Sequence, residues 1–306
     1  MTKSKEYPSY INLFKSGKLE ERVRIFLEKL KNCDICPRKC GVDRTREEKG
    51  FCRTGRYALV SSYNLHFGEE PPISGYRGSG TIFFSFCNLS CIFCQNWTIS
   101  HLGEGYVVSP FDLKEIMLDL QRAGAHNLNL VTPTHIVPQF MEALYLAIKE
   151  GFSLPIVYNS SGYDSVETLK LLDGVIDIYM PDAKYGENRW AEKLSGAGDY
   201  VEVSREALKE MYRQVGEFEV DGEGIAKRGV LVRHLILPEN MASSFKVLDF
   251  LKENLPGSLV ALLSQYWPSY NALKYPQLGR RITLKEYEEV ANYAKKIKLK
   301  NLYLQK

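Results

Sequence analysis

Three cysteines in one short stretch of the sequence have the spacing of a metal-cluster ligand set. Cys87, Cys91 and Cys94 form a CxxxCxxC pattern directly after the apolar, strand-like run 81–86. Thiolates are the usual protein ligands of iron–sulfur clusters, and three of them leave one iron of a 4Fe-4S cluster without a protein ligand. Because an open metal position can bind another molecule, this stretch predicts a cluster that does chemistry.

These cysteines also admit two simpler interpretations. The spacing also suits three core cysteines on one helix face, and zinc with His66 or His101 as a fourth ligand is possible. However, the chain has seven cysteines, three within residues 87–94 and four within residues 33–52. Core cysteines would be scattered along the chain, so the clustering favours metal ligands.

The second group of cysteines lies nearer the N-terminus and consists of Cys33, Cys36, Cys40 and Cys52. Four thiolates can complete a closed site for zinc or for a second 4Fe-4S cluster. The sequence does not choose between the two metals, nor between a structural and a redox role.

The composition argues against several classes of partner. The 306 residues carry a formal net charge of only +3, which gives no strong field for nucleic acid or anionic lipid. No apolar run approaches the ~18–20 residues that span a bilayer, and the N-terminus lacks the apolar part of a signal peptide. We therefore expect a cytoplasmic protein, in which clustered cysteines bind metal rather than form disulfides.

From residue 80 onward, strand-like and helix-like segments alternate, which predicts an α/β fold with a parallel sheet. The expected strands are 80–86, 127–131, 154–158, 175–180, 230–237 and 258–263. The expected helices are 18–31, 111–123, 136–150, 165–173, 204–215, 240–253 and 284–297. A Gly-rich stretch near residue 75 suggests two domains, an N-terminal helix and four-Cys segment (1–75) and the main domain (76–306). Glu69 and Glu70 are interpreted as part of an ordinary solvated turn.

Ligands of parallel α/β sheets bind at the carboxyl ends of the strands. Polar residues follow every expected strand, which favours one binding face. Beyond the cysteine loop, these segments are 132–135, 159–162, 181–184, 233–239 and 264–268.

The cysteine loop and its context resemble the radical S-adenosylmethionine (SAM) superfamily. The segments HFGEEPPISGYRGSG, NLNLVTPTH, YNSSGY and YMPDAKY are similar to its pyruvate formate-lyase-activating-enzyme-like branch. The resemblance implies a partial (β/α)6 barrel. It also implies SAM contacts from Thr132, His135, Asn159, Ser160, Asp182, Lys184, Arg233 and Gln265. Asn159 stands where the activases have an Asp beside a cation, which puts that cation in doubt.

The same resemblance implies a function. A 4Fe-4S cluster would cleave SAM reductively to a 5′-deoxyadenosyl radical, with ferredoxin or flavodoxin as electron donor and a glycyl-radical enzyme as the protein substrate. One alternative is radical SAM modification of a small molecule, a peptide or an RNA base. An alternative from another class is a non-catalytic zinc or iron–sulfur scaffold.

Overall fold

The computed structural model describes residues 7–305, which form an open, twisted sheet with helices on its outside. The strands are β1 (Ala58–His66), β2 (Ser79–Phe84), β3 (Tyr106–Val108), β4 (Leu128–Val131), β5 (Ile156–Asn159), β6 (Ile178–Tyr179), β7 (Glu219–Val220), β8 (Ala226–Leu235), β9 (Leu259–Leu263) and β10 (Asn301–Leu304). The α-helices are α1 (Tyr10–Lys15), α2 (Lys18–Lys29), α3 (Pro71–Ser74), α4 (Pro110–Arg122), α5 (Val137–Lys149), α6 (Val166–Leu171), α7 (Asn188–Ser195), α8 (Tyr200–Val215), α9 (Ser244–Asn254) and α10 (Leu284–Lys296).

The sheet has the order β10-β9-β8-β6-β5-β4-β2-β1-β3, and β7 pairs with β8. The neighbours β2, β4, β5, β6, β8 and β9 are all parallel, which confirms the six strands expected from the sequence. Within the described residues, the sheet ends at β3 and β10 without closing, as a partial barrel does. The carboxyl ends of the six strands therefore meet around one open interior.

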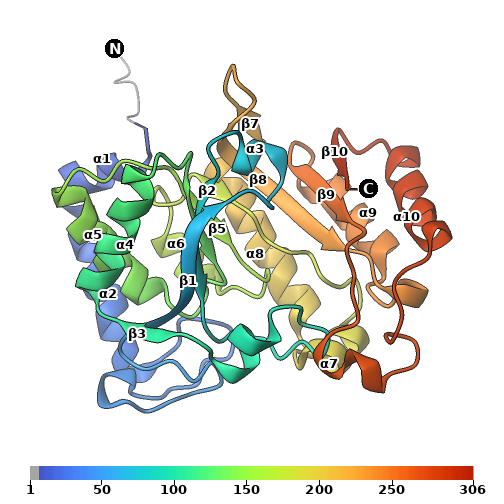
Figure 1. Cartoon of the computed structure of the whole chain (residues 1–306), viewed down its shortest axis with the longest axis horizontal. Coiled ribbons are helices and arrows are strands. Elements are labelled where there is room, and N and C mark those ends of the chain that lie inside the picture. The colour runs from blue at the N-terminus through green and yellow to red at the C-terminus, as the bar shows by residue number, and fades with distance from the viewer. Residues whose placement is uncertain (1–6, 306) are drawn as a thin grey trace.

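The helices between the strands are amphipathic, and their apolar faces cover the outside of the sheet. On α5, for example, Phe140, Met141 and Leu144 are buried together with sheet residues such as Leu130. Figure 1 shows α2, α4 and α5 at one end of the molecule and α9 and α10 at the other. Burial of this face, rather than helix propensity, supplies most of the stability of such helices.

Side chains cap several of the helix starts. Thr283 and Glu286 form a complete capping box at α10. Ser165 caps α6 by accepting from the backbone N–H of Thr168. Asp164 is instead engaged by three buried hydroxyl groups, which keeps its carboxylate away from the helix start.

The N-terminal segment is continuous with the main sheet. β1 pairs with β2 in antiparallel fashion, so the sheet extends across the boundary expected near residue 75. Tyr10 and Phe26 of the N-terminal helices are fully buried in the core that also contains Leu130. The division at residue 75 stays a prediction, and both parts share one sheet and one core.

In the described part of the chain, no helix combines the length and the apolar character that a membrane crossing requires.

Candidate functional site

A cavity of about 180 Å³ lies where the carboxyl ends of the parallel strands meet. Its lining includes Cys87, Cys91, Cys94, Thr132, Asn159, Ser160, Ser161, Asp182, Lys184 and Arg233, with Phe83, Phe84, Leu89 and Ile99 among its apolar residues. The structure thus brings the three cysteines together with most of the side chains that the sequence predicted to contact a cofactor. We call this space the cysteine cavity.

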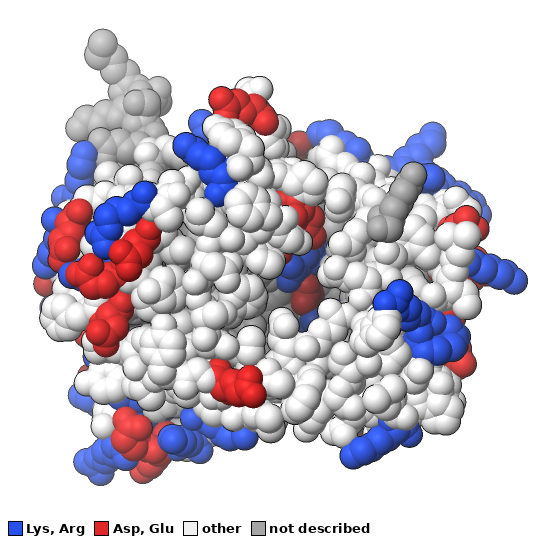
Figure 2. Space-filling view, in the orientation of Figure 1, with Lys and Arg blue, Asp and Glu red and all other residues white. Residues whose placement is uncertain are grey.

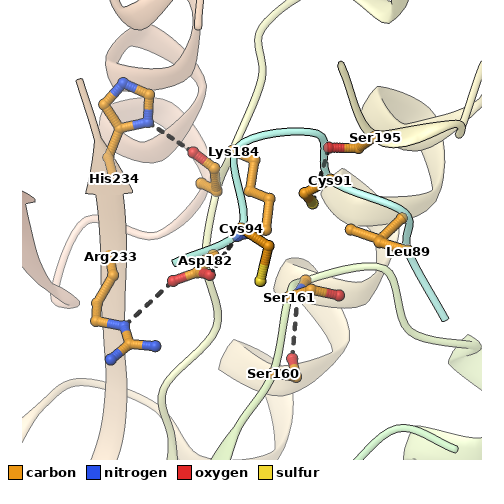
Figure 3. Close-up of polar contacts among 12 residues, drawn as sticks. Leu89, Cys91, Cys94, Ser160, Ser161, Asp182, Lys184, Ser195, Arg233 and His234 are labelled. Carbon is orange, nitrogen blue, oxygen red and sulfur yellow. Dashed lines mark hydrogen bonds and ion pairs between the residues drawn. The ribbon is translucent and has the colours of Figure 1, made fainter. Parts of the chain in front are cut away.

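The loop that carries the three cysteines is held in a defined shape by local contacts. Phe86 at its start has a left-handed backbone (φ 67°), which is costly for a residue with a side chain. Ser195 at the end of α7 donates to Cys91 Sγ over 2.9 Å, and Ser100 donates to Cys94 Sγ over 3.1 Å. Figure 3 shows Cys91 and Cys94 near Lys184 and Ser195. These donors orient the sulfurs in the way that groups around a metal orient its ligands.

The electrostatic surroundings favour metal binding by these sulfurs over free thiolates. Burial raises the pKa of Cys87 to about 12 and also raises the pKa of Cys91. The Lys184 ammonium opposes this effect at Cys91. Without a metal both groups are therefore neutral thiols at pH 7, and a bound metal cation would supply the charge that stabilises their thiolates.

Lys184 and Asp182 form a close ion pair at the end of β6. Lys184 Nζ lies 2.6 Å from Asp182 Oδ2, and both side chains are largely buried. Burial alone would raise the pKa of Asp182, but Lys184 and Arg233 outweigh it and hold the pKa below its usual value. Burial likewise opposes the charge on Lys184, but Asp182 and Cys91 raise its pKa. The pair is therefore charged at neutral pH and presents fixed charges to the cavity.

Arg233 on β8 is fixed by three oxygen partners. Its guanidinium donates to Asp182 Oδ1 at 3.2 Å, Asn159 Oδ1 at 2.6 Å and Glu69 Oε2 at 3.1 Å. Its neighbour His234 points to the other side of the strand and hydrogen-bonds the carbonyl of Ala183 (Figure 3). The planar guanidinium of Arg233 thus links the turn after β1 to the ends of β5 and β6 by hydrogen bonds.

Glu69 is a site residue that the sequence analysis missed. Its side chain is only 9% exposed, and besides Arg233 it accepts from Asn129 at 2.9 Å and Asn159 at 3.4 Å. The interpretation of Glu69 and Glu70 as a solvated turn is wrong, because both are buried against the interior of the barrel. The adjacent prolines suggested a turn exposed to solvent. The ion-pair partner of Glu69 is Arg233, which lies 164 residues further along the chain, so the local sequence gives no sign of this contact.

The loop after β5 forms another wall of the cavity. Ser160 donates to Asp164, and Gly162 has a left-handed backbone (φ 75°). The hydroxyl of Ser161 is buried and has no hydrogen-bond partner within the described residues. Thr132 opposite also has a positive φ of 62°, which is rare for a β-branched residue. An unpaired hydroxyl and a strained backbone at one cavity are typical of a ligand site.

Two of the predicted cofactor contacts lie elsewhere. His135 lines the space between the four N-terminal cysteines, and its Nε2 is hydrogen-bonded to the Ser85 carbonyl at 2.9 Å. Gln265 lines a smaller cavity that shares Arg233 with the cysteine cavity. Neither His135 nor Gln265 lines the cysteine cavity, and their contact with SAM stays a prediction.

The two histidines considered as zinc ligands are also occupied otherwise. His101 Nε2 lies 3.0 Å from the Cys91 carbonyl oxygen, and its ring stacks on Tyr270. His66 on β1 makes an edge contact with the ring of Phe83. Neither histidine lines the cysteine cavity.

The four N-terminal cysteines line one small space together with Arg44 and His135. Arg44 is 1% exposed and donates to the carbonyls of Gly55 and His135, while its Nη2 has no partner in the part of the chain described. Its Nη1 lies 3.8 Å from Cys33 Sγ. No acidic residue among residues 7–305 lines this space, so thiolates are the groups there that can balance the buried cation.

Across residues 7–305, no three His, Cys, Asp or Glu side chains are grouped as a site for one metal ion. A 4Fe-4S cluster does not need such a group, because each thiolate binds a different iron atom. The donor set and the size of the cysteine cavity therefore fit a cluster with three protein ligands.

Comparison with known proteins agrees with this geometry. A profile of the radical SAM superfamily matches residues 81–220. The uncharacterized protein MJ0674 of Methanocaldococcus jannaschii is 33% identical over 298 residues, covering 94% of this chain and 82% of that protein. The uncharacterized protein MJ0808 of the same organism is 23% identical, covering 87% and 82%. The chain therefore contains a radical SAM superfamily domain.

Solved structures with a similar chain path include methylornithine synthase (PylB), with a TM-score of 0.48 and 14% identity over 92% of this chain and 72% of that one. Streptococcus suis SuiB has a TM-score of 0.46 and 15% identity over 72% and 47%.

Proposed function

We propose that this protein is an enzyme that cleaves SAM reductively at a 4Fe-4S cluster held by Cys87, Cys91 and Cys94. One observation carries the proposal: these cysteines line the same cavity as Asp182, Lys184 and Arg233. When bound, the cluster supplies the electron that breaks the sulfonium bond and releases a 5′-deoxyadenosyl radical. The protein's part is to hold the ligand in place and exclude water, while the cofactor does the hard chemistry.

The side chains of the cavity suit the charges of SAM. Lys184 can receive the carboxylate of the methionyl group, and Asp182 can balance a positive charge, because both are held ionised in place. The hydroxyl of Ser161 and the amide of Asn159 can bind the sugar or base by hydrogen bonds. Apolar residues such as Phe84 and Leu89 form the rest of the lining and limit access of water.

The test is SAM cleavage by anaerobically reconstituted protein with dithionite as electron source. We expect 5′-deoxyadenosine from the wild type and none above background from Cys91→Ala, because one ligand of the cluster is gone. Cys40→Ser is the matched control, because Cys40 lies outside the cysteine cavity. This variant should keep the iron bound by Cys87, Cys91 and Cys94, and EPR measures that iron. Equal turnover in the wild type and Cys91→Ala would contradict the proposal.

For the substrate, we propose a protein, in the manner of the glycyl-radical activases, with ferredoxin or flavodoxin as electron donor. The open side of the barrel supports access by a large substrate, since the recess on the face in Figure 2 is surrounded mainly by uncharged surface. A glycine-centred EPR signal on a partner protein is the expected result. Consumption of a small metabolite without such a signal would favour a small-molecule substrate instead.

For the four-Cys group, we propose a bound metal centre, with Arg44 as the buried cation that balances its thiolates. Iron, zinc and sulfide counts on Cys36→Ala against the wild type identify the metal. A loss of zinc alone assigns a zinc site, and a loss of iron and sulfide assigns a second cluster.

A further inference from the structure

A second, smaller cavity of about 40 Å³ adjoins the cysteine cavity, and Arg233 lines both. Its lining includes Glu69, Glu70, Arg233, Gln265, Tyr303 and Gln305. We call it the Glu70 cavity. The residues come from the turn after β1 and from the ends of β9 and β10, so the cavity lies on the open side of the barrel. Figure 2 shows acidic and basic atoms together at the bottom of a recess near the middle of the face.

Glu69 is not the group that needs a ligand here. Its two carboxylate oxygens are occupied by Arg233, Asn129 and Asn159. Its backbone N–H is bonded to the hydroxyl of Ser74. Glu69 is therefore a fixed, negatively charged wall of the cavity.

Glu70 is different, because it is buried without a matching partner. Glu70 is only 6% exposed, and its Oε2 has no hydrogen-bond partner among the described residues. Burial raises the pKa of Glu70, with Arg233 opposing and Glu69 and Asp182 adding to the rise. A buried carboxylate oxygen without a donor is costly, so the site lacks a group that donates hydrogen bonds or brings positive charge.

Gln305 presents a second unsatisfied acceptor to the same cavity. Its amide nitrogen donates to Gln265 Oε1 over 3.1 Å, and its own Oε1 is buried with no partner in the described chain. Of the side chains that line this cavity, the buried groups left without partners are thus two oxygens and no nitrogen. Both would be satisfied by N–H donors.

The charges of the surrounding residues point in the same direction. Around Arg233, the three carboxylates of Glu69, Glu70 and Asp182 face two cations, Arg233 and Lys184. One further positive charge would balance the group. A space of about 40 Å³ exceeds the roughly 10–15 Å³ that one water needs, so it admits a small cationic head group.

We propose that the Glu70 cavity binds an ammonium group, with Glu70 and Gln305 as its acceptors. The source is either the amine of a substrate or the free ion. The binding itself does not depend on SAM cleavage, whereas the use of the site to anchor an amine substrate rests on the proposed function.

The experiment measures cation binding to the full-length, anaerobically reconstituted protein by calorimetry and thermal shift. Ammonium chloride and methylammonium chloride are compared with sodium chloride and tetramethylammonium chloride at equal ionic strength. We expect ammonium to bind and to raise the Tm relative to sodium and tetramethylammonium. Glu70→Gln should weaken the binding at least tenfold, while the exposed change Glu253→Gln should leave it unaltered.

Methylammonium distinguishes the two sources. Binding of both ammonium and methylammonium supports the amine of a substrate, and binding of ammonium alone supports the free ion. Gln305→Leu removes the second acceptor and tests the site independently if Glu70→Gln does not fold. Equal effects of ammonium and sodium on the wild type, or undiminished binding in both variants, would overturn the proposal. Protein that binds ammonium but does not cleave SAM would refute the proposed function alone.

Discussion

At the scale of single residues, Ser195 sets the surroundings of Cys91. The hydroxyl donates to the sulfur over 2.9 Å and is itself fully buried beside the hydroxyl of Tyr185. A hydrogen bond to a cluster ligand stabilises the reduced state more than the oxidised state, because the reduced state carries more negative charge. Ser195 is therefore a positioning residue that would tune the potential of a bound cluster.

Ser195→Ala should lower that reduction potential by roughly 20–60 mV, since a net hydrogen bond is worth ~0.5–1.5 kcal/mol and 59 mV corresponds to a tenfold change for one electron. The measurement is a redox titration followed by EPR. Ser258→Ala is the matched control, because the buried hydroxyl of Ser258 donates to the backbone carbonyl of Leu255 and not to a sulfur. An unchanged potential in Ser195→Ala would argue against tuning by this bond.

Asp164 predicts a pH dependence of stability. It is buried and accepts from the hydroxyls of Thr134, Tyr158 and Ser160, and burial raises its pKa above the usual value. Because the pKa of Asp164 is raised in the folded state, its contribution to the free energy of unfolding is largest at pH values below the unfolded pKa of ~3.9. This contribution declines as the pH rises through the folded pKa. The unfolding free energy of the wild type minus that of Asp164→Asn should therefore fall with rising pH. Urea titrations across this range test it, and a rising difference would show the opposite sign.

The sequence predicted site residues only where the residues of one group lie close together along the chain. The cysteine loop and the Asp182–Lys184 pair each lie within a few residues of one another, and both were found. The positions of Glu69 and His135 were not foreseen, because their hydrogen-bond partners Arg233 and Ser85 lie in distant segments. Nothing near His135 in the sequence indicates that it faces Arg44 and not the cysteine cavity.

At the scale of elements, the turn after β5 depends on a residue without a side chain. Gly162 has a φ of 75°, and a Cβ at this position would overlap the carbonyl oxygen of Asp182. The turn therefore sets the distance between the ends of β5 and β6. Because Asp182 lines the cysteine cavity, a bulkier residue here would displace part of the site.

Gly162→Ala should lower the free energy of unfolding by ~2–5 kcal/mol, from the left-handed backbone plus overpacking, and weaken SAM binding. Gly124→Ala is a matched control with φ 85° and open space around the new methyl group. It should cost only ~1–2 kcal/mol and leave SAM affinity unchanged. Urea unfolding and calorimetric SAM titration measure both quantities. The prediction fails if the two variants behave alike.

The longer elements were predictable because their apolar periodicity is strong, and the six parallel strands were all found. The short elements β3, β7, β10 and α7 were not, since two to eight residues carry too little periodic signal. β6 is reduced to two residues, although a longer apolar run was expected there. Its pairing is set by its neighbours β5 and β8 and not by its own composition.

At the scale of the whole molecule, the N-terminal segment completes the core of the barrel. Tyr10, Leu19, Phe26 and Leu30 are fully buried, and the hydroxyl of Tyr10 donates to the Leu154 carbonyl. At ~1.5–3 kcal/mol for each large apolar side chain, these four residues contribute about 6–12 kcal/mol. That is comparable to the whole stability of a typical domain.

A fragment of residues 76–306 should therefore fail to fold cooperatively, because it also lacks the strand that pairs with β2. Far-UV circular dichroism during urea unfolding, compared with the full chain, is the measurement. A sharp transition in the fragment would instead establish the boundary near residue 75 as that of an independent domain.

One residue, His135, links the surroundings of the two cysteine groups. Its backbone carbonyl accepts from Arg44 beside the N-terminal cysteines, and its ring Nε2 is hydrogen-bonded to the carbonyl of Ser85, two residues before Cys87. A substitution that displaced His135 would therefore disturb the surroundings of both cysteine groups at once.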